Sequence, residues 1–423
     1  MDKKTKLTAI LATGVVIFVA FSGCIGGEKE EKAELQIVHW WTAGGEKEAI
    51  NALFSMYRDK YPNIGINEEP ISGGAGADMK AVMKTQIFAG NPPSTFQVHI
   101  GYELKPYYDG DALEDITWLW EQEGWGDNFP ADLQEMAQFD DEYYAVPVGI
   151  HRGNLVWYNM EIFKEHNLKL PTTFDELLSV CESLKNEGIT PLAVGTLNKW
   201  PGAHLFEVIL MSVGADFYSD FISGKVNIND PRFDEALNRY ADLFEYINSN
   251  HAALTWDQAC GEVLSGDAAM TLMGDWAKGY FDTRGWRYGV NYSIFEFPET
   301  RGVFDVICDS FCLPKNAPSR DAAIKWLQLI GSIKGQNKFN PIKGSIPPRI
   351  DAPTDEYDDL AKATIADFRV CTLVPSIAHG SATPESFVTK FNDYMDNYIT
   401  YGDKTAVKSG IQKAIENELL PYM

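Results

Sequence analysis

The first third of the chain alternates between strand-like and helix-like patterns of apolar and polar positions. Residues 35–40 and 64–71 alternate or run apolar as strands do, and residues 95–99 form a third such run. Residues 46–61 carry apolar side chains at helical spacing, and a second helix is expected to end near residue 88. This β-α-β-α-β order predicts a mostly parallel sheet with helices on both faces.

The stretch 143–159 predicts a passage from one sheet to another. Two β-prone runs, 144–148 and 154–158, are separated by Gly149 and Gly153, with Pro147 inside the first run. Proline has no backbone N–H to donate and glycine adopts angles that other residues avoid, so the strand is expected to bend here. We expect the cleft beside this crossover to be the working site.

Beyond the crossover the chain predicts a second α/β series. Thr173 and Glu176 form a capping box that opens a helix, and Asp230-Pro231 places proline at the first position of another. Strands are expected over 268–273 and 303–313, and the stretch 340–349 is expected to be another strand that passes between the two halves.

Length and charge set the class of protein and exclude some partners. At 423 residues the chain is too long for one ordinary core, so two lobes are expected. The formal net charge of −24 repels nucleic acid and anionic headgroups, which excludes both as partners. We expect a monomer.

The N-terminus reads as a secretory signal. Lys3, Lys4 and Lys6 precede an apolar run over 7–21, and small residues lead to Cys24. Residues 1–23 are therefore expected to be a signal peptide, Cys24 a lipid-anchor cysteine, and 24–33 the anchor and a solvated tether. An uncleaved signal anchor is the alternative.

Other kinds of site find little support in the pattern. The remaining cysteines (181, 260, 308, 312 and 371) are expected to be mostly buried, with at most one disulfide that the sequence cannot assign. The seven histidines show no His-x3-His spacing, so neither a metal nor another cofactor is expected. The glycine run 73–76 lacks the signature of a nucleotide-phosphate loop.

Several short motifs together resemble a known family. The signal with Cys24, the runs Val-His-Trp-Trp at 38–41 and Tyr-Ala-Val-Pro at 144–147, and the segments 273–276 and 344–347 are similar to the extracellular solute-binding proteins (family 1) of ABC sugar importers. The glucose- and galactose-binding branch is the most similar.

The resemblance implies an α/β, two-lobe fold of the type II periplasmic-binding-protein kind, with mostly parallel sheets flanked by helices and about three inter-lobe crossovers. Residues 34–147 and 300–345 would form lobe 1, and residues 148–299 and 346–423 would form lobe 2. The lobes would close over one sugar.

The resemblance also implies a set of ligand contacts, and they are residue types that suit a sugar. Planar polar groups serve the hydroxyls and aromatic rings serve the C–H face of the sugar ring. The implied contacts, with Trp276 added from the motif at 273–276, are Trp40, Trp41, Glu46, Gln97, His99, Trp256, Asp275, Trp276, Asp309, Lys343 and His379.

Each candidate also has a purely structural interpretation. One of Trp40 and Trp41 is expected to fill the core while the other stacks on a ligand. Glu46 could be a first-turn carboxylate favoured by the helix dipole. The remaining alternatives are that Gln97 and His99 lie exposed on an edge, that Asp275 caps a turn, and that Asp309 and Lys343 pair as a salt bridge.

The sequence therefore predicts a carrier located outside the cytoplasm that delivers a monosaccharide, glucose or galactose, to membrane permease subunits without catalysis. One alternative keeps the role but changes the ligand to a disaccharide or oligosaccharide, for which Trp200, Trp276 and Trp286 could provide further stacking. The other alternative is a secreted glycoside hydrolase, which needs two carboxylates at a fixed separation.

Overall fold

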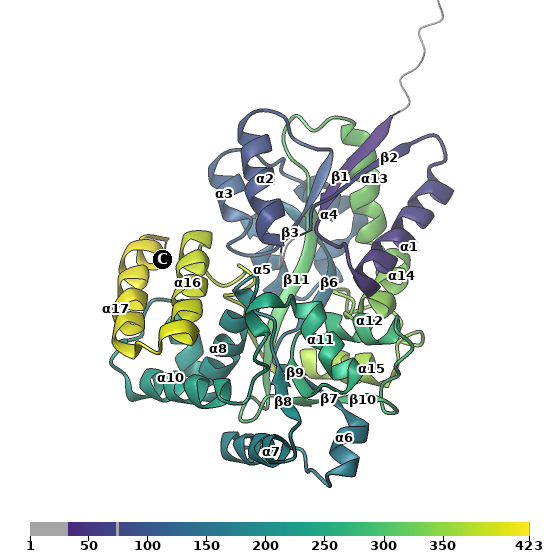
Figure 1. Ribbon diagram of the computed structural model, residues 1–423. Helices are drawn as coiled ribbons and strands as arrows, with labels where there is room; N and C mark the ends of the chain where they lie inside the picture. Colours follow the sequence, from purple (N-terminus) through teal and green to yellow (C-terminus); the bar gives the residue numbers. More distant parts are fainter. Residues whose placement is uncertain (1–32, 73–75, 423) are drawn as a thin grey trace, which may run out of the picture. The chain divides into compact units, whose positions relative to one another are not determined.

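A sheet of six strands carries the N-terminal part of the fold (Figure 1). The computed structural model describes residues 33–72 and 76–422; the expected signal peptide, Cys24 and the tether up to residue 32 lie outside the described residues. The strand order is β12-β11-β3-β1-β2, with β6 pairing β11. The strands are β1 (Glu34–His39), β2 (Gly65–Pro70), β3 (Thr95–His99), β6 (Ala145–Arg152), β11 (Val303–Cys312) and β12 (Thr372–Pro375).

A second sheet has the order β10-β7-β9-β8. Its strands are β7 (Leu155–Asn159), β8 (Thr190–Ala193), β9 (Ala268–Leu272) and β10 (Tyr292–Glu296). A small hairpin joins β4 (Gln138–Phe139) to β5 (Glu142–Tyr143). The described residues, 33–72 and 76–422, form one compact unit.

The α/β class is as predicted, but the sheets are mixed rather than mostly parallel. In the first sheet β1 runs parallel to β2 and β3, whereas β11 runs antiparallel to both β3 and β6. In the second sheet β7 is antiparallel to both neighbours. The reversals arise because β6 leaves the first sheet for the second and β11 runs beside it in the opposite direction.

The predicted crossover is confirmed. The strand β6 pairs with β11 in the first sheet, and β7, which starts three residues after β6 ends, pairs with β9 and β10 in the second. A Cβ atom on Gly153 would lie 1.9 Å from the carboxylate of Asp305. Only glycine fits this bend between the sheets.

The stretch 340–349 is not the strand that we expected. Helix α14 covers Ile333–Lys343 with Pro341 in its last turn, and it ends at Gly344, whose φ of 95° is left-handed. The extended part is reduced to an isolated bridge in which the backbones of Ile346 and Ile150 exchange two hydrogen bonds of 2.9 Å. Apolar and polar spacing over so short a segment did not distinguish a helix end from a strand.

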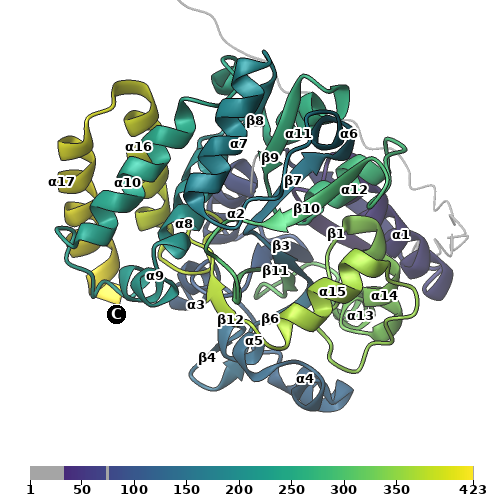
Figure 2. The same cartoon turned by 90° about the horizontal axis from the view of Figure 1, so that it is seen from below.

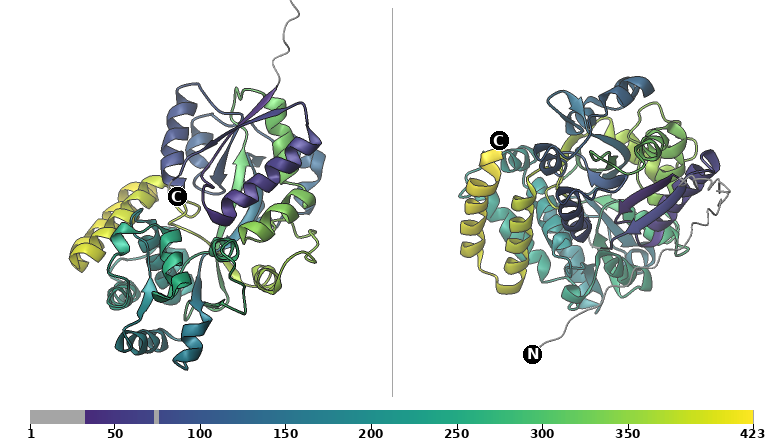
Figure 3. Two further views of the ribbon diagram at one scale, coloured as in Figure 1. Left: turned by 45° about the vertical axis from the view of Figure 1, so that its right-hand side comes forward. Right: turned by 90° about the horizontal axis from the view of Figure 1, so that it is seen from above.

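Helices cover both sheets. Around the first sheet lie α1 (Gly44–Lys60), α2 (Ala77–Phe88), α3 (Lys105–Asp109), α4 (Thr117–Glu123), α5 (Ala131–Met136), α13 (Arg320–Ile330) and α14. The others are α6 (Met160–Glu165), α7 (Phe174–Asn186), α8 (Trp200–Ser212), α9 (Ala215–Ile222), α10 (Pro231–Phe244), α11 (Trp256–Ser265), α12 (Trp276–Asp282), α15 (Asp359–Phe368), α16 (Glu385–Tyr401) and α17 (Lys404–Ala414). Figure 2 shows α16 and α17 on the same side as α10, and Figure 3 shows α1 beside α14.

Local sequence signals explain where several helices begin. The capping box of Thr173 and Glu176 is formed at the start of α7, and the Asp230 carboxylate accepts a hydrogen bond from a first-turn amide of α10. Helix α8 is buried along its whole length, as expected for a helix in which most residues are apolar. It packs against α10 and α16 and leads directly to the site described next.

Candidate functional site

A cavity of about 420 Å³ lies where loops and strand ends of both sheets meet. Trp40 follows β1, Glu46 lies in the first turn of α1, and Trp256 and Trp276 begin α11 and α12. The full lining is Trp40, Thr42, Ala43, Glu46, Ser72, Asp78, His99, His151, Leu197, Asn198, Trp200, Thr255, Trp256, Asp257, Trp276, Ile307, Asp309, Lys343 and His379.

Most of the residues expected at the site come together here. The cavity wall includes Trp40, Glu46, His99, Trp256, Trp276, Asp309, Lys343 and His379. Trp41 is fully buried against Phe311 and Phe339, so it fills the core while Trp40 faces the cavity. Gln97 and Asp275 stand behind the wall rather than in it.

The carboxylate of Asp309 is the centre of a buried network. It accepts hydrogen bonds from Gln97 Nε2 at 2.9 Å and from His151 Nε2 at 3.0 Å, and His99 Nε2 lies at 3.5 Å. Burial alone would raise the pKa of Asp309, but the hydrogen bonds from the two histidines outweigh it and hold the pKa well below its usual range. Asp309 is therefore a fixed anion in the cavity wall.

Two further carboxylates orient the histidines from behind. Asp275 pairs with Nδ1 of His151 and also accepts the backbone N–H of Arg152 at 3.1 Å. Burial and the charge of Lys343 lower the pKa of His151, but Asp275 and Asp309 together outweigh them and raise it. The resulting chain of alternating charges spans the crossover strands β6 and β11.

His99 is held in the same way. Its Nδ1 lies 2.8 Å from Glu103 Oε2, and Lys80 Nζ lies 2.9 Å from the same oxygen. Burial lowers the pKa of His99, but Glu103 and the hydrogen bond to Asp309 outweigh it, so the pKa is raised. The positive end of this chain is Lys80, whose ammonium also lies 5.5 Å from the Trp40 ring.

Lys343 and Glu46 form a second buried pair. Lys343 Nζ lies 3.0 Å from Glu46 Oε1, and the same ammonium lies 5.8 Å from the Trp276 ring. Burial raises the pKa of Glu46 despite the nearby lysine. Lys343 therefore pairs with Glu46, and no direct pair with Asp309 is formed between these described residues.

Indole rings form the apolar part of the wall. Trp200 and Trp276 lie 6.2 Å apart between ring centroids, and each lies 5.2 Å from the ring of His379. Trp256 stands edge-on to Trp276 at 6.5 Å. Trp286, by contrast, packs on Phe281 outside the cavity. Rings at several angles can contact the C–H faces of a small ligand while leaving polar atoms free.

Two buried polar atoms of the wall make no hydrogen bond within the described part of the chain. They are Nε1 of Trp200 and Nε2 of His379. Burial and neighbouring histidines hold the pKa of His379 well below its usual range, so the ring is neutral. The Ser376 hydroxyl lies 2.7 Å from Glu207 Oε1 and 2.8 Å from His379 Nδ1, so Nδ1 is already engaged. Nε2 is therefore the ring nitrogen of His379 that is left for a ligand, and Nε1 of Trp200 is a donor.

The structural interpretations of Gln97, His99 and Asp275 are wrong. Gln97 and His99 lie on β3, which is flanked by β1 and β11, so neither residue is on an edge. Asp275 occupies the N-cap position of α12 but makes no capping hydrogen bond, because its oxygens are used by His151 and Arg152.

Sequence reasoning missed His151 and placed Trp200 only as an accessory aromatic. His151 belongs to the crossover stretch beside which the site was predicted, so its location near the site could have been predicted from the sequence, whereas its role could not. Loop residues such as Thr42, Asn198 and Asp257 carry no motif and could not be found this way.

The five described cysteines are all unpaired, and four of them are buried. No helix among residues 33–72 and 76–422 is long and apolar enough to cross a membrane.

Comparison with known proteins finds similar sequences in one protein family. A family model described as bacterial extracellular solute-binding protein matches residues 42–337. An uncharacterized ABC transporter extracellular-binding protein of Pyrococcus horikoshii is 45% identical over 100% of this chain and 98% of its own length. A probable sugar-binding periplasmic protein of Brucella melitensis is 32% identical over 90% and 91%. A xylose/arabinose-binding protein of Haloferax volcanii is 30% identical over 89% and 83%.

Solved structures share the fold at low sequence identity. A chitin oligosaccharide binding protein superposes with a TM-score of 0.81 at 17% identity, covering 92% of this chain and 100% of its own. A bacterial solute receptor described as having an exclusive preference for β-D-galactopyranose gives 0.79 at 18% identity, covering 91% and 98%. These structures support the type II solute-binding fold and do not bear on the ligand of this chain.

Proposed function

Because the chain belongs to the bacterial extracellular solute-binding proteins of ABC transporters, we propose that its cavity captures a monosaccharide, glucose or galactose. Proteins of this family bind solutes and are not enzymes, so the glycoside hydrolase alternative is set aside. The observation that carries the proposal is the cavity of about 420 Å³, in which indole rings surround paired charges and two unpartnered polar atoms.

The charges of the wall favour a neutral polyol. Lys343 is matched by Glu46 and His99 by Glu103, while His151 is matched by Asp275 and Asp309. An anionic ligand would also meet Asp78 and Asp257 at the cavity wall, and a cationic one would compete with pairs already formed. Sugar hydroxyls can instead donate to Asp309 and accept from Lys343 without adding net charge.

The size of the cavity favours one sugar ring. Ligand pockets span roughly 300–1,000 Å³, and this one lies near the lower limit. Trp276 and Trp40 are the rings that we assign to its two apolar faces. The relatives described as binding xylose or arabinose, and sugar more generally, agree with this class of ligand. A disaccharide remains the second candidate because Trp200 and Trp256 extend the aromatic wall.

We further propose that capture is coupled to closure of two lobes, residues 34–147 with 300–345 and residues 148–299 with 346–423. The lobes would rotate about the crossover near Gly153 and the segment that follows Gly344. Only the closed and loaded form would engage the permease subunits. The strand β12 lies in the range assigned to lobe 2 but pairs with β11 in the first sheet. The boundary between the two lobes would therefore be placed in a loop next to β12 rather than within the strand.

The protein is also proposed to be held at the outer face of the membrane by a lipid on Cys24. If so, the Cys24→Ser variant should be recovered from the medium or periplasm, while the unaltered chain stays with the membrane fraction. Equal partition of the two proteins would contradict the anchor without affecting the sugar proposal.

A titration of tryptophan fluorescence tests the ligand. The full-length protein would be titrated with glucose, galactose, xylose, arabinose and maltose, and the expected result is a saturable change with glucose or galactose at the lowest concentration. A saturable response to maltose alone would keep the carrier and change the ligand to a disaccharide. A response to none of these sugars, repeated by calorimetry, would refute the proposal for all of them.

A further inference from the structure

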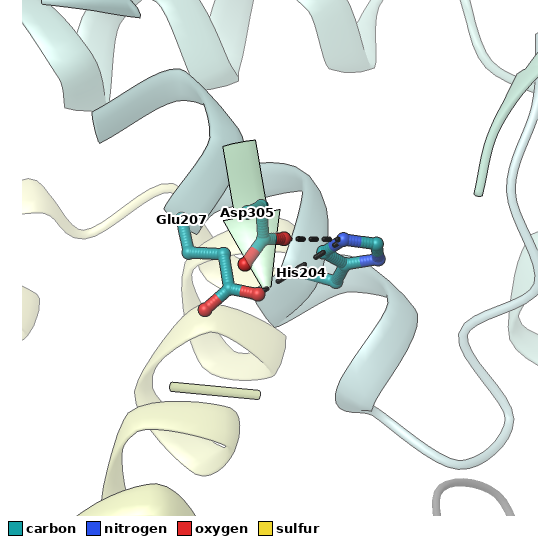
Figure 4. A group of neighbouring side chains, drawn as sticks. All are labelled: His204, Glu207 and Asp305. Carbon is teal, nitrogen blue, oxygen red and sulfur yellow. Dashed lines mark ion pairs between the residues drawn. The ribbon is translucent and has the colours of Figure 1, made fainter. Parts of the chain in front are cut away.

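Three ionisable side chains meet behind the aromatic wall, away from the cavity lining (Figure 4). His204 and Glu207 lie one turn apart on α8, and Asp305 comes from β11. All three side chains are fully buried, and their nearest donor atoms lie within 4.8 Å of one another. His204 Nε2 is 3.3 Å from Asp305 Oδ2 and 4.0 Å from Glu207 Oε1.

Much of this cluster has no hydrogen-bond partner. Neither nitrogen of His204 and neither oxygen of Asp305 makes a hydrogen bond to any described residue. Glu207 differs, because Ser376 Oγ and the backbone N–H groups of Ile377 and Ala378 donate to it at 2.7 to 3.0 Å. Glu207 is therefore oriented by the loop, while one ring nitrogen of His204 faces an oxygen of each carboxylate (Figure 4).

The cluster also sets two carboxyl groups close together. Glu207 and Asp305 are both fully buried and share one site with the imidazole of His204. Arg152 is the cation that acts on Asp305, but its guanidinium already pairs with Glu296 and Asp367 at 2.8 Å each. Burying two carboxyl groups without a counter-charge is costly, and a divalent cation would neutralise both.

We propose that His204, Glu207 and Asp305 bind one divalent transition-metal ion, of which Zn²⁺ is the representative. One imidazole and two carboxylates are a donor set that such ions accept. Tetrahedral Zn²⁺ with bonds of about 2.0–2.2 Å places its donors roughly 3.3–3.5 Å apart. The His204–Asp305 separation of 3.3 Å already meets this spacing, and the His204–Glu207 separation of 4.0 Å would have to shorten by roughly 0.6 Å.

The position gives the ion a structural role. Gly153 closes the cluster on the crossover side, since a Cβ there would lie 1.9 Å from Asp305 Oδ2 and 2.9 Å from His204 Nε2. The ion would join β11 to α8 and, through Glu207, to the loop that carries His379. Trp200 lies one turn before His204 on the same helix, so the ion would brace the back of the cavity wall. The proposal does not depend on which solute is bound.

Zinc titration of the full-length protein, freed of metal by a chelator, tests the site. The expected result is one Zn²⁺ per chain, measured by competition with a chelating dye, and a melting temperature that rises with zinc concentration. His204→Gln and Asp305→Asn should each weaken zinc binding by about 100-fold or more. The control is His166→Gln, which makes the same change at a partly exposed histidine outside the cluster and should bind zinc as the wild type does.

Failure of zinc to bind the wild type, or equal affinity in the two ligand variants and the control, would overturn the proposal. If the ligand variants do not fold, X-ray absorption of the zinc-loaded wild type decides instead. One imidazole nitrogen with oxygen donors and no sulfur would support the site, whereas sulfur ligation or several imidazoles would assign the ion elsewhere and overturn it.

Discussion

Replacing Asp309 by asparagine tests the network at the centre of the candidate site. The side chain keeps its shape but loses its charge, and one of its two oxygens becomes an N–H2 group. That group must face either Gln97 Nε2 or His151 Nε2, both of which now donate to Asp309 at 2.9 and 3.0 Å. At least one charge-assisted hydrogen bond is lost in a fully buried place.

The expected magnitude follows from that lost bond. A hydrogen bond to a charged group contributes about 1.5–3 kcal/mol, so the ligand-free protein should lose roughly that much free energy of unfolding. If a sugar hydroxyl also uses Asp309, affinity for glucose or galactose should fall by about 10- to 100-fold, since about 1.4 kcal/mol corresponds to tenfold.

Calorimetric titration and denaturant unfolding measure the two effects separately. Asp78→Asn is the matched control, because it removes the same charge from the same cavity at an exposed position in the first turn of α2. We expect it to change unfolding by less than about 1 kcal/mol and affinity by less than about threefold. An Asp309→Asn protein that unfolds and binds as the control does would refute the account of the network.

Three further predictions concern closure, stacking and pH. A Cβ on Gly45 would lie 2.7 Å from Gly279 Cα, so Gly45→Ala should weaken sugar binding by about 5- to 150-fold. Gly65→Ala is the control and should leave binding unchanged, because a Cβ on this exposed glycine would come no closer than 3.5 Å to the Glu34 side chain. Equal calorimetric affinities of the two variants would contradict closure of α1 onto α12. Trp276→Ala should remove the saturable fluorescence change and weaken binding by at least about tenfold, and unaltered titration would exclude Trp276 as a stacking ring. The pKa of His151 is raised in the fold, so its stabilising charge is fully present below about pH 6.5 and is lost as the pH rises through the raised value. The melting temperature should therefore fall on the alkaline side, and it should fall less steeply in His151→Gln. Identical pH profiles of the two proteins would contradict this.

The sequence was informative about the fold wherever local chemistry has few solutions. The glycines and proline of the stretch 143–159 left little freedom but to bend, and the bend lies between the two sheets. The capping box at Thr173 was likewise predicted and formed. Strand direction could not be predicted in this way, because it depends on where β11 returns after more than a hundred residues of the second half.

The stretch 340–349 illustrates the limit of short patterns. The stretch was expected to be extended, yet α14 continues through Pro341 to Lys343. Proline removes only its own N–H bond there, and the next turn is still closed by the N–H of Gly344 on the carbonyl of Asn340 at 2.9 Å.

Residue types and the family resemblance located much of the candidate site, but contact geometry had to come from the structure. Adjacent positions 40 and 41 alternate in direction after β1, so one indole faces the cavity and the other the core. Gln97 and Asp275 have the polarity of ligand contacts and act instead through Asp309 and His151. The cluster of His204, Glu207 and Asp305 was missed because one of its members is about a hundred residues distant and histidine pairs alone were sought.

A crystal structure with the tightest-binding sugar is the most direct test of the central claim. The account predicts density for one sugar ring within the cavity of about 420 Å³, with hydroxyls in hydrogen-bond distance of Asp309 and of Nε2 of His379, and with Trp276 against a face of the ring. A sugar bound elsewhere, or a longer chain of sugar rings that fills the cavity and leaves Asp309 without a contact, would contradict it.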